Sequence, residues 1–114
     1  MADYRAHLSH LSVPAQKVRL VIDQIRGKGA NEALDILRYT PKRAAVPVHK
    51  LLTSAIANAE ENFGVSRDDL FVATVFANEA PTRKWRRFGA RGRFKPILRR
   101  TSHVTVILRE RESA

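Results

Sequence analysis

Residues 83–100, RKWRRFGARGRFKPILRR, limit most strongly what this chain can fold into. The segment contains nine lysines and arginines and no acidic residue. Uncompensated charges of one sign repel each other, and they are too costly to bury in an apolar core. We therefore expect this segment to lie in water or against a polyanion, outside the packed body of the protein.

Aromatic residues and glycines are placed between these charges. Trp85, Phe88 and Phe94 offer faces on which nucleobases stack, and Gly89 and Gly92 allow close approach of the backbone. Arginine side chains add bidentate hydrogen bonds to phosphate. A solvated, disordered charge run is the competing interpretation, but large aromatics are unusual in such runs. The pattern therefore predicts a nucleic-acid-binding arm, and we interpret its partner as RNA.

The segments on either side of the arm predict strands. Residues 70–78, LFVATVFAN, are apolar on both faces, which is typical of a central strand. Residues 101–108, TSHVTVIL, are rich in the β-branched residues that favour strands. We expect the two strands to form a β-hairpin whose basic part covers about residues 80–102. Alternating polarity in residues 2–11 predicts a third strand, at an edge of the sheet.

Between the predicted strands at residues 2–11 and 70–78, the helical spacing of apolar residues first predicts two helices. The first begins near Pro14 and ends at Arg26 and the glycines that follow it. The second covers residues 30–37, with Asn31 as its N-cap. The apolar stripe of the first helix consists of Val18, Val21, Ile22 and Ile25.

A third helix has the most regular pattern in the chain. We expect Thr40 to cap it, Pro41 to occupy its first turn and Gly64 to end it. Pro47 lacks a backbone N–H and is predicted to kink or loosen the first turns. The stripe consists of Val48, Leu51, Leu52, Ala55, Ile56, Ala59 and Phe63. The order of elements predicts an α+β fold in which three helices pack on a small three-stranded antiparallel sheet with a long protruding β-hairpin.

Length and composition limit the remaining possibilities. The 114 residues are expected to form one domain, residues 1–114, and the net charge of +10 favours a polyanionic partner. Nucleic acid fits that charge first and an anionic membrane surface second. The chain has no cysteine, and neither a signal-peptide pattern nor a membrane-spanning run is visible. We therefore expect a soluble cytosolic protein.

A second group of basic residues surrounds the first predicted helix. Lys17, Arg19, Arg26 and Lys28 form either a second RNA-contacting face or an ordinary solvated helix surface, and both interpretations stay open. A helix-turn-helix is disfavoured because the second helix is short and acidic.

The histidines give little indication of catalysis or metal binding. His7 and His10 are three residues apart in a predicted strand, so we expect them on opposite faces. His103 is interpreted as a hydrogen-bonding structural residue that also contacts RNA. No nucleophile–base set, phosphate-binding loop or carboxylate pair is visible. We expect no enzyme activity, no cofactor and no metal.

Several stretches together resemble the bacterial large-subunit ribosomal protein L22 family. These are AQKVRLVIDQIRGK (residues 15–28), EALDILRYTPKRAA (32–45), SAIANAEENFG (54–64) and RRTSHVTVIL (99–108), with Gly92-Arg93 before the last of them. The likeness covers nearly the whole chain in order. Gly89 and Pro14 depart from the pattern, because the family commonly has a basic residue and a capping serine there.

The resemblance implies a structural, non-catalytic component of the large ribosomal subunit. Such a protein would bind 23S rRNA, contact other large-subunit proteins and support subunit assembly, and its hairpin would line the nascent-peptide exit tunnel. The RNA-binding residues implied by the arm, the second basic group and this resemblance are Lys17, Arg19, Arg26, Lys28, Arg83, Lys84, Trp85, Arg86, Arg87, Arg91, Gly92, Arg93, Lys95, Arg99, Arg100 and His103. The residues implied for the tunnel-facing tip are Arg86, Arg87, Phe88, Gly89, Ala90, Arg91, Gly92 and Arg93.

Two other classes of function are compatible with part of the sequence. A free-standing nucleic-acid-binding regulator or RNA chaperone would share the basic arm but would not sediment with large subunits. An RNA-modifying enzyme would require an acid–base or cofactor set, which the sequence does not present. We expect no membrane partner and no homo-oligomer.

Overall fold

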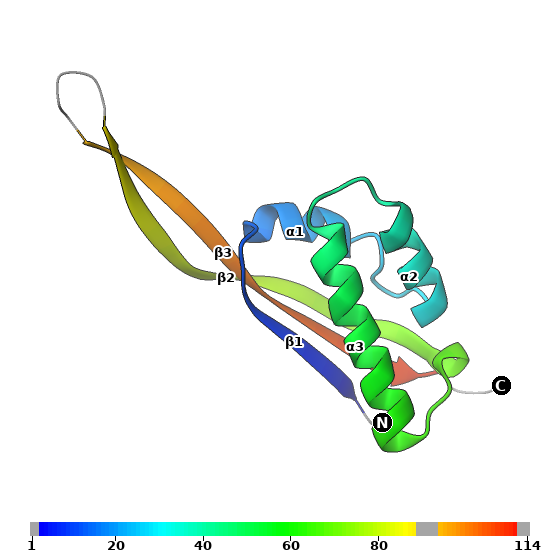
Figure 1. Cartoon of the computed structure of the whole chain (residues 1–114). Helices are drawn as coiled ribbons and strands as arrows, with labels where there is room; N and C mark the ends of the chain where they lie inside the picture. Colours follow the sequence, from blue (N-terminus) through cyan, green and yellow to red (C-terminus); the bar gives the residue numbers. More distant parts are fainter. Residues whose placement is uncertain (1–2, 89–93, 112–114) are drawn as a thin grey trace.

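The protein consists of a three-stranded antiparallel sheet with three helices against one of its faces (Figure 1). The structure is a computed structural model that describes residues 3–88 and 94–111. The predicted α+β fold is confirmed. In chain order the elements are β1 (Tyr4–Leu11), α1 (Ala15–Ile22), α2 (Ala30–Tyr39), α3 (Ala45–Phe63), the short 3-10 helix η1 (Arg67–Asp69), β2 (Leu70–Phe88) and β3 (Phe94–Glu110).

The strand order is β1-β3-β2, so β3 is the central strand. The edge position predicted for β1 is confirmed, but the central position predicted for β2 is wrong. Apolar residues on both faces of a strand do not determine how many neighbours it has. The outer edge of β2 is covered instead by the segment after α1. There, Gly27 N–H donates to the Val72 carbonyl at 2.9 Å, and Val72 N–H donates to the Lys28 carbonyl at 2.8 Å.

The core lies between the helices and the inner face of the sheet. All four residues of the stripe predicted for the first helix are completely buried, although α1 ends at Ile22 and Ile25 belongs to the turn after it. Six of the seven stripe residues of α3 are also buried. The exception is Phe63, which is 59% exposed at the end of α3, with its ring centroid 5.0 Å from that of Tyr4.

The helix ends differ from the prediction at two connections. Asn31 does not cap α2, because Gly29 holds the N-cap position and the Asn31 side chain donates to Asp68 Oδ1 at 2.7 Å. Thr40 does not begin α3. It is the C-cap residue of α2, where its hydroxyl donates to the Ile36 carbonyl at 2.6 Å. A threonine followed by a proline is equally typical of a helix start. The sequence alone therefore did not show whether Thr40 ends α2 or begins α3.

Pro47 does not remove a hydrogen bond from α3. The helix begins at Ala45, so Pro47 is its third residue. The first backbone N–H groups of any α-helix lack a partner within the helix, and a proline there costs nothing in hydrogen bonding. The predicted loosening of the first turns therefore has no physical cause. The predicted end of the helix is confirmed at Gly64, which has a left-handed φ of 67°.

The hairpin extends well beyond the helices (Figure 1). β2 and β3 pair from Leu70↔Glu110 to Phe88↔Phe94, with a register shift between Ala80 and Arg83. The molecule is 69 Å long but only 25 and 19 Å across. The long protruding hairpin predicted from the sequence is therefore present. The predicted tip residues 89–93 lie outside the described residues.

Candidate nucleic-acid interface

The register of the arm places basic residues opposite one another. Arg83 pairs with Arg99, and Arg87 pairs with Lys95, in the antiparallel ladder. Like charges at directly opposite positions destabilise a strand pair. The backbone pairing therefore concentrates positive charge along the arm, and a bound polyanion would relieve the repulsion between these residues.

Two hydrogen bonds lie at the root of the arm. The first joins its two strands: the Thr101 hydroxyl donates to the Pro81 carbonyl at 3.1 Å, across the irregular part of the ladder. The hydroxyl of Ser102, which is fully buried, donates to the Val13 carbonyl at 2.9 Å and joins β3 to the segment before α1. Arg99 and Arg100 are exposed next to this anchored root. The Ser102 bond therefore ties the root of the arm to the body.

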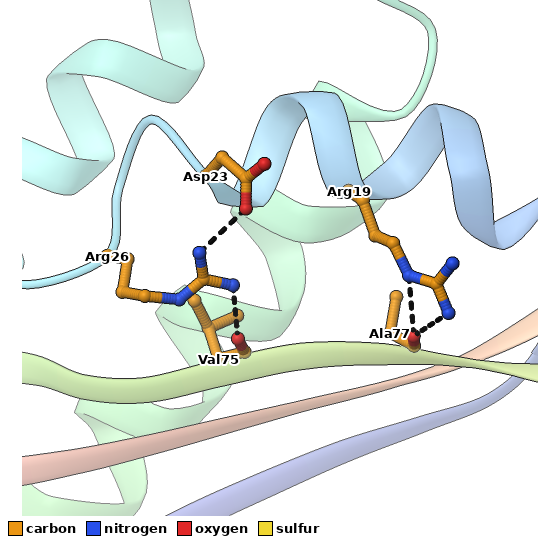
Figure 2. Close-up of polar contacts among 5 residues, drawn as sticks. All are labelled: Arg19, Asp23, Arg26, Val75 and Ala77. Atoms are coloured by element: carbon orange, nitrogen blue, oxygen red, sulfur yellow. Dashed lines mark hydrogen bonds and ion pairs between the residues drawn. The ribbon is translucent and has the colours of Figure 1, made fainter.

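Arg19 and Arg26 bind the backbone of β2 (Figure 2). Arg19 donates to the Ala77 carbonyl through Nε at 3.2 Å and Nη2 at 2.9 Å. Arg26 donates through Nη2 to the Val75 carbonyl at 2.8 Å, and its Nη1 lies 2.7 Å from Asp23 Oδ1. Both carbonyls belong to the strand at the edge of the sheet, so the two arginines satisfy acceptors that the ladder leaves unpaired.

The second basic group therefore divides into two kinds of residue. Arg19 and Arg26 have structural partners within the protein, which no feature of the sequence indicated. All four residues, Lys17 and Lys28 included, are exposed, as a residue that contacts RNA must be. RNA contact by any of the four stays a prediction.

Three of the four histidines gather at a bulge between β1 and β3. Nδ1 of His103 accepts a hydrogen bond from the His10 backbone N–H at 3.1 Å. The His103 ring lies 4.8 Å from that of His10 and 5.8 Å from that of His7, measured between centroids. The prediction that His7 and His10 lie on opposite faces of the strand is wrong, because both rings lie near His103. The strand does not continue regularly between them: its register shifts after Leu8, and His10 adopts a φ of 55°.

Further basic residues surround the α2–α3 connection, and sequence reasoning missed them. Lys42 and Arg43 are exposed within it, and Arg38 and Lys50 are exposed on the flanking helices. Apart from the adjacent pair Lys42 and Arg43, uncharged residues separate them in the sequence, and they form no long run. The only available signal was the fragment TPKRAA, which contains two adjacent cations.

Among the described residues, the groups with shifted pKa values lie at the far end of the sheet from the arm. Arg109 Nε is 2.6 Å from Asp3 Oδ1, and this hydrogen bond lowers the pKa of Asp3 and raises that of Arg109. Burial, followed by a hydrogen bond to Glu110, raises the pKa of Tyr4. Within residues 3–88 and 94–111, no set of three or more His, Cys, Asp or Glu residues is placed to hold a metal ion. In that part of the chain, no helix is long and apolar enough to cross a membrane.

These features define a class of protein in which a compact α+β body carries a long, cationic β-hairpin. The chain belongs to the ribosomal protein L22p/L17e family, whose model matches residues 6–109. The resemblance found in the sequence is thereby confirmed. Proteins of this family are structural and non-enzymatic components of the ribosome, which places the chain at ribosomes in the cytoplasm.

Two relatives illustrate how much of the chain this similarity covers. The large ribosomal subunit protein uL22 of Pediococcus pentosaceus is 50% identical over 100 residues, which span 88% of this chain and 85% of the relative. The large ribosomal subunit protein uL22 of Finegoldia magna is 48% identical over 108 residues, which span 95% and 96%. The similarity thus includes both the body and the arm.

Proposed function

We propose that this protein is a structural component of the large ribosomal subunit that binds 23S rRNA and supports subunit assembly. The observation that carries the proposal is the register of the arm, which sets Arg83 opposite Arg99 and Arg87 opposite Lys95. RNA phosphates would neutralise this charge, and the anchored root would hold the arm at a fixed angle to the body. Neighbouring large-subunit proteins would be its other partners.

Replacement of Arg99 and Arg100 by glutamine tests the proposal. Both residues are exposed, so we expect the variant to keep its thermal unfolding midpoint while its affinity for protein-free 23S rRNA falls about tenfold. If the wild-type protein contacts about six phosphates, log K should fall against log salt with a slope of about −4 to −5. Arg5→Gln with Arg67→Gln is a matched control, because it removes two charges far from the arm.

Sedimentation separates this function from the alternative. A ribosomal component should co-sediment with large subunits at moderate salt. Recovery of the protein mainly in free form, bound to short RNA sites, would instead identify a free-standing regulator or RNA chaperone.

We further propose that the hairpin lines the exit tunnel and that its tip meets the nascent peptide. This part rests on the family and on the length of the arm. A photo-crosslinking amino acid at position 90 should label a stalled nascent chain in translating ribosomes. The same label at position 5, on β1, should not; labelling only from position 5 would contradict the tunnel placement.

A further inference from the structure

The histidine cluster, which consists of His7, His10 and His103, lies on the face of the sheet that the helices leave uncovered. Ser102 and Val104, on either side of His103, are completely buried. Successive side chains of a strand point to opposite faces, so His103 lies on the outer face. Its ring is within 4.8 Å of the His10 ring and 5.8 Å of the His7 ring, between centroids. Water reaches the cluster, because His7 and His10 are exposed and His103 is half-buried.

A ring nitrogen joins β1 to β3 where their ladder is interrupted. The ladder is regular as far as the pair Leu8↔Val104 and resumes at Leu11↔Ser102. Between these pairs His10 has a φ of 55°, and in the part of the chain that the structure describes it is the one non-glycine residue with a positive φ. Its backbone N–H donates at 3.1 Å to Nδ1 of the His103 ring. The irregular stretch of β1 is therefore held by a side chain that can take up a proton.

This bond exists in only one protonation state of His103. A backbone N–H can only donate, so Nδ1 must be the unprotonated nitrogen of a neutral ring. An imidazolium ring carries a proton on both nitrogens and has no acceptor left. The contact between His7 Nδ1 and Thr105 Oγ1, at 2.8 Å, is different, because a hydroxyl can donate or accept. Protonation therefore removes the His10 bond and leaves the Thr105 contact possible.

The charges around the cluster add to the effect of a proton. The helices lie against the other face of the sheet (Figure 1). Glu79 and Arg100 line a hollow on that helix side, next to α1, and Arg109 is paired with Asp3. On β2 the positions nearest the cluster hold the uncharged residues Phe76 and Asn78. Arg5, two positions before the first histidine, shares the outer face with the cluster. Protonated rings would therefore repel one another and Arg5.

We propose that the histidine cluster is a pH-sensitive switch, in which neutral His103 holds the irregular end of β1 to β3 and protonated His103 releases it. The released stretch leads into Val13, whose carbonyl accepts the Ser102 bond at the root of the arm. Stability contributed by the His10 bond is present while the ring is neutral. It is lost as the pH falls through the range, from about pH 8 to about pH 5, in which histidines change charge. The switch is separate from the proposed function, because it does not require RNA.

His103→Asn tests the switch in the full-length protein. Asparagine keeps a side-chain acceptor, Oδ1, near the position of Nδ1 but does not titrate. The urea midpoint of the wild-type protein, measured from about pH 8 to about pH 5, should fall more steeply than that of the variant. His49→Asn is the matched control, because it removes an imidazole from α3, outside the cluster, and its profile should follow wild type. Parallel profiles for wild type and His103→Asn would overturn the inference.

Nuclear magnetic resonance tests the bond itself in the wild-type protein. The amide proton of His10 should move upfield as the pH falls, with the same midpoint as the titration of the His103 ring, because the two groups share one hydrogen bond. In His103→Asn the His10 amide should not follow this curve. If that variant does not fold, the wild-type titration decides alone. A His10 amide that stays in place while the His103 ring takes up its proton would overturn the switch.

Discussion

The guanidinium group of Arg19 holds the backbone carbonyl of Ala77 with two hydrogen bonds, through Nε at 3.2 Å and Nη2 at 2.9 Å. Arg19 lies on α1 and Ala77 on the outer strand of the sheet (Figure 2). An unpaired strand edge offers hydrogen-bonding groups to other chains, and proteins commonly cover such edges. Here α1 covers part of the edge with a side chain and thereby joins the helix layer to the strand that continues into the arm.

Arg19→Gln should destabilise the protein by about 1–2 kcal/mol, because a partly buried carbonyl loses a charged donor. Urea unfolding followed by circular dichroism measures this change. Lys17→Gln is the matched control: it lies two residues away on the same helix, is exposed, and should change stability by less than about 0.5 kcal/mol. Equal losses in the two variants would show that the Ala77 contact does not stabilise the fold.

Arg26 has two partners of unequal importance. Its ion pair with Asp23 is exposed on both sides, with 47% and 59% of the side chains accessible, whereas its other bond reaches the Val75 carbonyl. Asp23→Asn should therefore cost less than about 0.5 kcal/mol. Arg26→Gln should cost about 1 kcal/mol, because the carbonyl loses its donor. Unfolding free energies of the two variants, compared in urea, check the order; a larger loss for Asp23→Asn would reverse this assignment.

The sequence indicated the core of this fold better than its connections. The stripes of α1 and α3 could be read directly, because burial imposes a period of 3.6 residues on a helix. The pairing partner of a strand depends on contacts far apart in the sequence, so the apolar residues 70–78 did not reveal an edge strand. Thr40 followed by Pro41 satisfied local rules for a helix start, but the structure uses Thr40 at a helix end.

Gly64 ends α3 in the left-handed conformation, with a φ of 67°. Gly64→Ala should cost about 1 kcal/mol, because a Cβ is disfavoured at that φ even though the surrounding space is open. Gly29→Ala is a useful comparison. Its Cβ would meet only the guanidinium of Arg111, at 2.7 Å, and this flexible side chain can move away. We expect a change below about 0.5 kcal/mol for Gly29→Ala in thermal or urea unfolding. Equal losses of stability in the two variants would indicate that the left-handed backbone is not the reason why glycine is favoured at position 64.

The candidate interface could be predicted only in part, for a similar reason. The arm is a continuous run of charge, so composition alone identified Arg99 and Arg100. Lys42 and Arg43 line the same surface hollow as Lys17. No local sequence pattern indicates that these three residues lie close together. The structural partners of Arg19 were equally invisible, because a cation that binds a carbonyl has the same sequence signature as one that binds phosphate.

Tyr4 makes the stability of the protein depend on pH in the alkaline range. Its hydroxyl donates to Glu110 Oε1 at 3.1 Å, and burial together with this bond raises its pKa above the ordinary value of 10.0. The folded state therefore retains the proton at a pH at which the unfolded chain releases it. The contribution of Tyr4 to stability is complete below about pH 10 and is lost as the pH rises through the folded-state pKa.

Tyr4→Phe keeps the ring in place and removes the titrating group. The urea midpoint of the wild-type protein, measured from pH 8 to pH 11.5, should therefore fall more steeply above about pH 10 than that of the variant. Tyr39→Phe is the control, because Tyr39 is 78% exposed, and its profile should follow wild type. Lysines and arginines titrate in all three proteins, so only the difference between profiles reports on Tyr4. Parallel profiles for wild type and Tyr4→Phe would mean that the contact between the ends of β1 and β3 does not depend on the protonated hydroxyl.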